Sequence, residues 1–166
     1  MKIGLISDTH SYLDPVVFDY FKDCDELWHA GDVGDFSVLE QLEAFKPILC
    51  VYGNIDDAKV RAATREDFFF NREGLNIFMT HIGGKPSTYN PRVRPLIDNQ
   101  KPDVFVCGHS HILRVISDPK RPGLIYLNPG AAGKHGFHSV RTILRFDIFS
   151  GKIQNMEVIE LGKRGK

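Results

Sequence analysis

Five short motifs supply side chains that bind metal ions, and they follow one another along the chain. They are Asp8-Thr9-His10, Gly31-Asp32, Gly53-Asn54, Thr80-His81 and Gly108-His109-Ser110-His111. Asp and His side chains with an Asn carbonyl suit divalent transition metals, whereas a cage of carboxylates alone would suit Mg²⁺ or Ca²⁺. Each motif alone is common in loops without chemistry, but the ordered set predicts a hydrolytic centre with two metal ions.

Each motif also begins where an apolar run ends. Asp8, Asp32, Asn54, His81 and His109 come directly after such runs. Ligands of open α/β sheets bind outside the carboxyl ends of the strands, so these side chains are expected to meet in one crevice. Singly, Asp32 and Asn54 also suit turns beside their glycines, an alternative that does not explain the whole set.

Apolar runs alternate with amphipathic stretches in the first half of the chain. The pattern predicts strands at residues 2–7, 26–30 and 48–52, and helices at residues 15–21 and 36–45. Parallel strands joined by crossover helices follow from this order. At the start of the second helix, Ser37 with Glu40 fits a capping box, and Asp35 fits an N-cap.

The second half is richer in strands, which are predicted at residues 75–80, 103–107, 113–117, 124–127, 140–149 and 152–161. Only residues 91–99 look helical, and residues 61–72 have weak periodicity and are expected to form a loop. Ser150-Gly151 predicts a tight turn in an antiparallel hairpin. Phe68, Phe69 and Phe70 are expected in the core between two layers; because a strand cannot turn all three to one side, the alternative for at least one of them is a dimer interface or a substrate rim. Two packed sheets flanked by helices, an α/β architecture, are implied.

Length and composition predict one domain over residues 1–166, with enough apolar residues, 42%, for a sizeable core. Lys plus Arg balance Asp plus Glu at 21 each, so no overall field draws the protein to nucleic acid or to an anionic membrane. No apolar run approaches the roughly 18 residues of a membrane span, and a cytoplasmic protein is expected. Cys24, Cys50 and Cys107 lack a C-x-x-C pair and are expected as free thiols.

The ordered motifs resemble the calcineurin-like metallophosphoesterases, in particular their small bacterial and archaeal phosphodiesterases. The resemblance runs from Met1 to about residue 160. It implies a four-layer αββα sandwich of two mixed β-sheets flanked by helices. It also implies that Asp8, His10 and His111 hold one ion, that Asn54, His81 and His109 hold the other, and that Asp32 bridges them.

The same resemblance implies the reaction. A hydroxide that bridges the two ions would attack the phosphorus of a small phosphate ester in line, and Asp32, Asn54 and His109 would be the catalytic residues. Manganese is the expected metal, with iron, zinc, nickel or cobalt as alternatives. Phosphodiesters are the expected substrates, and the sequence gives no direct evidence for a nucleic-acid or membrane partner.

Two motifs depart from the family pattern. Many relatives carry Gly-Asn-His-Asp or Gly-Asn-His-Glu, in which the His donates a proton to the leaving group, but this chain has Ile55 at that position. An isoleucine cannot act as a general acid. The second departure is Ile82 in Thr80-His81-Ile82-Gly83-Gly84, where relatives often read Thr-His-Gly-His.

Residues for substrate contact are less clearly marked. Asn54, Arg141 and His138 are predicted to bind substrate, and His135 is a further candidate; exposed loop histidines are the alternative. Arg92, Arg94, Arg114 and Arg141 are candidates for a phosphate clamp, although surface ion pairs explain arginines equally well. His29 is expected to be a buried histidine outside the ligand set, and Asp56 is expected to order the Asn54 loop.

Two other functions compete with a phosphodiesterase. One is a protein-interaction scaffold, since the small retromer subunit shares this fold and has lost catalytic competence. The intact ligand positions argue against it. The other is a phosphomonoesterase, which the missing His at Ile55 disfavours. The oligomeric state is left open, with a homo-oligomer as one outcome.

Overall fold

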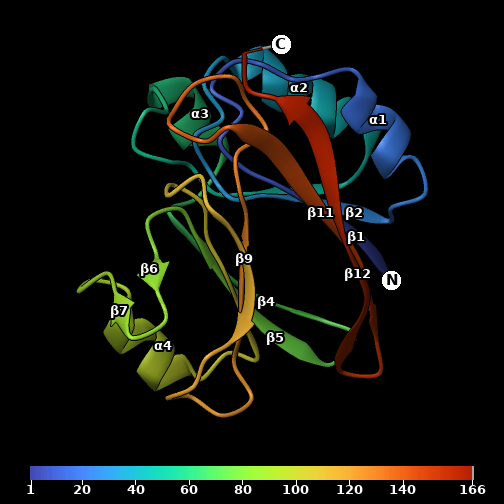
Figure 1. Ribbon diagram of the computed structural model, residues 1–166. Helices are drawn as coiled ribbons and strands as arrows, with labels where there is room; N and C mark the ends of the chain where they lie inside the picture. Colours follow the sequence, from blue (N-terminus) through green and yellow to red (C-terminus); the bar gives the residue numbers. More distant parts are fainter. Residues whose placement is uncertain (166) are drawn as a thin grey trace.

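Two β-sheets lie face to face in the computed structural model, which describes residues 1–165, and helices cover their outer sides (Figure 1). In chain order the elements are β1 (Lys2–Ile6), α1 (Val16–Phe21), β2 (Glu26–His29), α2 (Phe36–Phe45), β3 (Ile48–Cys50), α3 (Ala58–Ala63), β4 (Asp67–Arg72), β5 (Leu75–Thr80), β6 (Gly84–Lys85), β7 (Thr88–Tyr89), α4 (Arg94–Gln100), β8 (Val104–Val106), β9 (Leu113–Ser117), β10 (Ile125–Pro129), β11 (Val140–Phe149) and β12 (Lys152–Lys163). Among the described residues, no helix is long and apolar enough to cross a membrane.

The first sheet has the strand order β12-β11-β1-β2-β3. Strands β1, β2 and β3 are parallel, with α1 and α2 in the connections, as predicted. Strand β11 returns antiparallel to β1 and forms a hairpin with β12. Ser150 and Gly151 make the turn with positive φ angles of 49° and 70°, which suit the right-handed twist of a hairpin, so the predicted tight turn is confirmed.

The second sheet has the strand order β4-β5-β8-β10-β9. Its three central strands, β5, β8 and β10, are parallel to one another, and the edge strands β4 and β9 are antiparallel to them. Each sheet therefore contains three neighbouring parallel strands, whose carboxyl ends lie at one edge.

Alternation along the strands divides the core into three clusters. In β5, the side chains of Leu75, Ile77 and Met79 lie between the two sheets, while Phe78 points to the outer side, where α4 packs. On the first sheet, Ile3 and Leu5 face the second sheet, whereas the cluster on the other side joins the sheet to α1 and α2. The order helix, sheet, sheet, helix confirms the four-layer αββα architecture.

The loop predicted for residues 61–72 is wrong, because α3 and β4 occupy most of this segment. Asp57 caps α3 by accepting hydrogen bonds from the main-chain N–H groups of Lys59 and Val60, both at 3.0 Å. In β4, Phe68 and Phe70 pack between the sheets, and Phe69 points outward, is 43% exposed and stacks on Phe78. Six-residue elements are too short to show a clear hydrophobic period.

Three further local predictions can be compared with the structure. The N-cap of α2 is Asp35, whose carboxylate accepts a hydrogen bond from the Ser37 N–H at 2.9 Å, so the alternative capping box at Ser37 is wrong. Helix α4 begins at Arg94, three residues later than predicted. Cys24, Cys50 and Cys107 are free and buried, as expected.

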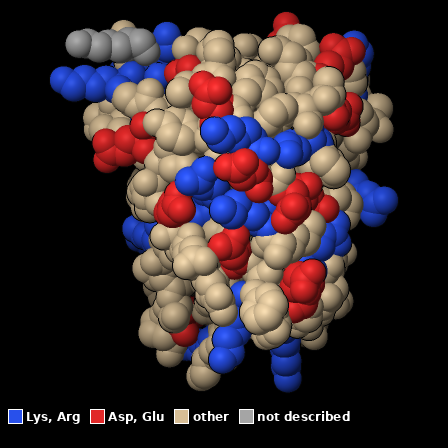
Figure 2. All heavy atoms as spheres, turned by 90° about the vertical axis from the view of Figure 1, so that its right-hand side faces the viewer, with Lys and Arg blue, Asp and Glu red and all other residues tan. Residues whose placement is uncertain are grey.

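The surface beside the β11–β12 hairpin carries charges of both signs. Figure 2 shows Lys and Arg side chains interspersed with Asp and Glu over this face of the molecule. Strands β11 and β12 lie on this side, and an ion pair of 2.6 Å joins Arg145 of one to Glu157 of the other. Positive and negative side chains are thus mixed on this face, as they are in the chain as a whole.

A partly buried ion pair joins the two sheets at the base of the central core. Arg72 of β4 donates hydrogen bonds to both carboxylate oxygens of Glu26 in β2, at 2.8–3.2 Å. The Trp28 indole N–H donates a further hydrogen bond to Glu26 Oε1 at 2.7 Å. Only 10% of the Glu26 side chain is exposed, so its charge depends on these donors.

We expect Arg72→Met to lower the free energy of unfolding by roughly 2 kcal/mol, because it leaves the Glu26 carboxylate buried without its cation. Adding Glu26→Gln should restore most of that loss. Urea titration followed by the fluorescence of Trp28, the only tryptophan in the chain, measures both changes. Arg94→Met serves as the control, since Arg94 is exposed and forms no ion pair among residues 1–165. Equal effects of Arg72→Met and Arg94→Met would contradict this role for the pair.

Candidate metal centre

The predicted motifs converge at the carboxyl ends of the parallel strands. Asp8 follows β1, Asp32 follows β2 and Asn54 follows β3 in the first sheet, while His81 follows β5 and His109 follows β8 in the second. Main-chain hydrogen bonds join neighbouring loops, from Asp8 N–H to Gly31 O at 2.9 Å and from Gly108 N–H to His81 O at 3.1 Å. The expectation of one shared crevice is therefore confirmed.

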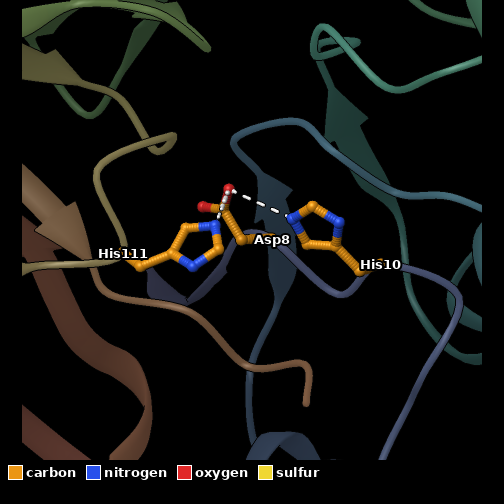
Figure 3. A group of neighbouring side chains, drawn as sticks. All are labelled: Asp8, His10 and His111. Carbon is orange, nitrogen blue, oxygen red and sulfur yellow. Dashed lines mark ion pairs between the residues drawn. The ribbon is translucent and has the colours of Figure 1, made fainter. Parts of the chain in front are cut away.

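One group of side chains gathers around Asp8. The Nε2 atom of His111 lies 3.1 Å from Asp8 Oδ1, and Nε2 of His10 lies 3.9 Å from the same oxygen. The two rings approach this carboxylate from different loops (Figure 3). Asp8, His10 and His111 together offer three ligand atoms to one ion.

A second group gathers around Asp32. Its Oδ1 atom lies 3.2 Å from Nε2 of His81, and the His109 ring lies edge-on to that of His81, with the ring centroids 5.3 Å apart. Asp32, His81 and His109 could hold a second ion. The other oxygen of Asp32, Oδ2, lies 3.4 Å from Nε2 of His10, so this carboxylate faces both groups.

Three buried polar atoms in these groups have no hydrogen-bond partner among the described residues: Asp8 Oδ1, His10 Nε2 and His81 Nε2. Leaving such atoms unpaired costs about 1–3 kcal/mol each. All three face the space shared by the two groups, where a divalent cation would satisfy them. The residues present therefore fit the metal ions that the motifs imply.

Neighbouring groups aim these atoms. The His81 Nδ1–H group donates to the Ala30 carbonyl at 2.7 Å, which leaves Nε2 with its free lone pair toward the site. Asp8 Oδ2 accepts hydrogen bonds from the Ser7 hydroxyl at 2.6 Å and from the His109 N–H at 3.1 Å. Oδ1 is left to face the histidines. Ser7, which directly follows β1, was not predicted to contact the site.

The backbone is strained at this site. Five residues of the two groups have left-handed conformations, with φ angles of 54° at Asp8, 45° at His10, 53° at Asp32, 65° at His109 and 58° at His111. Non-glycine residues seldom adopt this conformation, and each costs of order 1–3 kcal/mol. Such a concentration of strain is typical of a functional site.

Glycines make room for the acidic side chains. A Cβ atom at Gly53 would overlap the Asp32 carboxylate, and one at Gly108 would overlap the Ser7 hydroxyl. The loop at Gly53 is further ordered by Asp56, whose carboxylate accepts hydrogen bonds from the N–H groups of Gly53 at 2.7 Å and Gly34 at 2.8 Å. The predicted role of Asp56 is confirmed.

The charge states suit metal binding. Burial lowers the pKa of His10 and His109, which keeps these rings neutral with a lone pair available. Burial opposes the charged form of Asp32, but its contact with His81 outweighs this effect and lowers the pKa of Asp32. Burial likewise opposes protonation of His81, yet the carboxylates of Asp32 and Asp8 raise its pKa. A divalent cation at the centre would occupy the position that a proton on His81 Nε2 takes in the protein without metal.

Asn54 is exposed at the margin of the centre. It lines a hollow together with His81, and its role as a seventh ligand stays a prediction. Its neighbour Ile55 is 46% exposed and uses its N–H to donate a hydrogen bond to Asp32 Oδ1 at 3.1 Å. The position that carries a proton donor in many relatives therefore lies at the site but offers no acid.

His138 is committed to the protein instead of being free for substrate. Its Nε2 atom lies 2.9 Å from the Gly133 carbonyl and its Nδ1 atom 3.2 Å from Nδ1 of His111. Donation from His138 Nε2–H to Gly133 makes its Nδ1 the acceptor of the His111 proton, and this leaves His111 Nε2 free to face Asp8. His138 thus positions His111, while His135 packs against His10 with ring centroids 5.0 Å apart.

The structure does not bring Arg141 to the centre. Its guanidinium pairs with Asp14 at 2.9 Å and donates to the Leu161 carbonyl at 2.7 Å, and the residue is only 3% exposed. The prediction that Arg141 binds substrate is therefore wrong, because its donors are used within the fold. Arg92 is paired with Asp67, whereas Arg114 lines a hollow beside His109.

Comparison with known proteins agrees with the fold and the site. A family model described as the calcineurin-like phosphoesterase superfamily domain matches residues 1–151. The chain belongs to this superfamily. The match confirms the predicted class of protein, a phosphoesterase that uses divalent metal ions.

Two relatives are described as probable metallophosphoesterases. The one from Methanothermobacter thermautotrophicus is 33% identical over 138 residues, which cover 79% of this chain and 77% of the relative. The one from Methanocaldococcus jannaschii is 31% identical over 136 residues, which cover 79% of this chain and 68% of the relative.

Solved structures share the fold at lower identity. A single mutant of Vps29 from Entamoeba histolytica has a TM-score of 0.75 at 16% identity, covering 98% of this chain and 100% of that one. Wild-type Vps29 from the same organism, complexed with Zn²⁺, has a TM-score of 0.72 at 18% identity and covers 96% of this chain and 99% of that one. A predicted phosphoesterase from Streptococcus pneumoniae has a TM-score of 0.68 at 18% identity, with coverage of 99% and 90%.

His29 joins the first two motif loops from within the core, outside the ligand groups, as expected. Its Nδ1 atom accepts a hydrogen bond from the Gly31 N–H at 3.2 Å, and its Nε2–H donates to the Thr9 hydroxyl at 3.1 Å. The Thr9 hydroxyl in turn donates to the Val33 carbonyl at 2.9 Å. A neutral ring is required for this pattern, and burial lowers the pKa of His29 to about 4 from its ordinary value of 6.5.

The stabilisation that His29 provides should therefore be lost in acid. Between pH 6.5 and 4 the unfolded chain takes up a proton on this ring that the folded protein excludes, so the free energy of unfolding falls as pH falls. His29→Asn removes the titration and keeps an acceptor for Gly31. Its cost relative to wild type should be largest at pH 7 and should shrink by about 1.4 kcal/mol per pH unit within this window.

Urea denaturation of chelator-treated protein at several pH values measures this difference. Val38→Ala, a buried substitution in α2 without a titrating group, should cost the same at every pH. A cost of His29→Asn that stays constant from pH 7 to pH 5 would contradict the neutral, buried state of His29.

Proposed function

We propose that the protein is a phosphodiesterase that works with two divalent metal ions. The observation that carries this proposal is the position of Asp32, whose two carboxylate oxygens face the two separate ligand groups. Asp8, His10 and His111 would hold one ion, Asn54, His81 and His109 would hold the other, and Asp32 would join them. Manganese is the expected metal, with iron, zinc, nickel or cobalt as alternatives.

Two such ions would supply Lewis acidity and a water of lowered pKa. The chain's own contribution is placement and charge. Asp8 and Asp32 cancel two of the four positive charges of two divalent ions, so two remain to attract a phosphate anion. Net hydrolysis would add water across one P–O ester bond: the water oxygen forms the new bond to phosphorus, and the alcohol departs with a proton.

A diester is favoured over a monoester because two adjoining hollows open beside the second ligand group. One hollow is lined by Asn54 and His81, and another by His109. A phosphate with two substituents can use both. The ligand positions are all present, which supports a catalytic role over that of a scaffold alone.

We expect chelator-stripped protein to be inactive toward bis-p-nitrophenyl phosphate and to recover activity when Mn²⁺ is added. The diester should be hydrolysed faster than p-nitrophenyl phosphate under the same conditions. Asp32→Ala should remain at the level of the stripped protein because it loses the carboxylate shared by both groups. Release of nitrophenolate, with the bound metal counted by elemental analysis, checks each point.

Asp35→Ala is the matched control, since Asp35 lies three residues away, caps α2 at the surface and belongs to neither ligand group. If the protein binds two ions per chain and hydrolyses neither ester with any of the five metals, the proposed function is wrong.

The lack of an acid at Ile55 should make the rate depend on the leaving group. We expect kcat to fall steeply as the pKa of the departing alcohol rises across a series of aryl diesters, because general-acid help worth typically 10²–10⁴-fold is missing. Ile55→His should narrow the gap between phenyl and nitrophenyl esters, whereas Ile55→Gln, which is polar without being an acid, should not. A wild-type rate that is insensitive to the leaving group would show that another residue supplies the proton.

A further inference from the structure

Two hollows meet beside the His81–His109 pair, and their walls differ in charge. The first has a volume of about 270 Å³ and includes Asn54 and His81; the second has about 400 Å³ and includes His109. Ile82 and Asn90 line both, so the hollows adjoin at these residues. A diester centred on the metal groups would extend one arm into each.

The second hollow combines an apolar floor with positive charge. It lies between the β6–β7 hairpin and β9, an edge strand of the second sheet; Figure 1 shows the hairpin to the left of β9. Tyr89, Tyr126 and Ile112 give it apolar and aromatic surface. Lys85 and Arg114 also line it, no Asp or Glu does, and neither cation forms an ion pair among residues 1–165.

The first hollow is different because acidic residues face one of its two cations. Arg92 is held by Asp67 at 2.7 Å and lies 3.6 Å from Glu66, which itself lines the hollow. The guanidinium of Arg61 donates to the main-chain carbonyls of Asp56 at 2.7 Å and Gly53 at 3.3 Å, which occupy these donors without cancelling its charge. This hollow therefore offers a ligand less uncompensated positive charge and fewer free donors than the second.

We infer that the substrate is a phosphodiester with one negatively charged arm and one uncharged arm. The charged arm binds in the second hollow against Lys85 and Arg114, and the uncharged arm binds in the first. The inference rests on the proposed function, because it takes the phosphate to lie at the metal groups. An aromatic arm with an outer carboxylate or phosphate matches the tyrosines below and the cations at the rim.

A matched pair of substrates tests the assignment: 4-nitrophenyl phenyl phosphate and 4-nitrophenyl 4-carboxyphenyl phosphate, which release the same nitrophenolate. At low ionic strength, the carboxylated ester should have a kcat/KM at least about fivefold higher, from two partly exposed charge contacts. Salt should reduce this ratio. Lys85→Met and Arg114→Met should each lower the ratio, and the double variant should bring it close to one.

Lys120→Met is the control, since Lys120 is exposed and lies outside both hollows. Metal-dependent hydrolysis of both esters with a ratio at or below one in the wild type would overturn the inference and leave the proposed function standing. A ratio that is high but unchanged in the double variant would also overturn it.

A second measurement does not depend on turnover. Diphenyl phosphate and 4-carboxyphenyl phenyl phosphate are titrated into protein loaded with diamagnetic Zn²⁺, and amide shifts are followed by NMR. Tighter binding of the carboxylated compound, with shifts at Lys85 and Arg114 that disappear in the double variant, supports the inference even if neither ester is hydrolysed. Equal binding of the two compounds, or shifts confined to the first hollow, would overturn it.

Discussion

The structure depends on holding two buried carboxylates beside the same pair of imidazoles. His10 Nε2 lies 3.9 Å from Asp8 and 3.4 Å from Asp32, and His81 Nε2 lies 4.0 Å and 3.2 Å from them. Burial disfavours the charged form of His10, so a proton on His81, whose pKa the carboxylates raise, would still leave one of the two negative charges uncompensated. Only cations at the centre remove both the repulsion and the unpaired atoms, which is why binding of metal and stability of the site are linked.

Rigid secondary structure holds these carboxylates and imidazoles in place. Three parallel strands in each sheet bring the loops to one edge, and main-chain hydrogen bonds such as Asp8 N–H to Gly31 O fix their relative positions. The central core behind the site contains the fully buried Trp28, with Phe70 and Phe146 packed edge-on against it. Large buried aromatic side chains stabilise the protein strongly, and this stability allows the left-handed backbone at the ligands to persist. The free energy gained by apolar packing behind the site therefore offsets the backbone strain at the ligands.

Much of the fold and the centre could be predicted from local sequence, since strand ends in parallel sheets must converge and the ligand types are chemically distinctive. The predictions that were wrong concerned side chains whose contacts are with residues far away in the sequence. Arg141 looked like a substrate residue because sequence does not reveal its contact with Asp14, 127 positions away. His138 was placed near the site for the right reason, but its role depends on a carbonyl and a ring that only the folded loop brings together. Helix α3 and strand β4 were missed because six residues are too few to show a helical or strand period in the pattern of apolar residues.

Under the proposed function, recognition of the substrate would be local. The chain has no net charge, and the face in Figure 2 mixes both signs, so charges beyond about 8–10 Å of the centre are screened and largely cancel. The excess positive charge of two bound ions would attract any phosphate ester equally. Discrimination between esters then falls to the few side chains that touch the two arms. Because donors of Arg61 and Arg92 are used within the protein while Lys85 and Arg114 form no ion pair among residues 1–165, the asymmetry between the hollows, and not the metal centre, would decide which esters the proposed phosphodiesterase accepts.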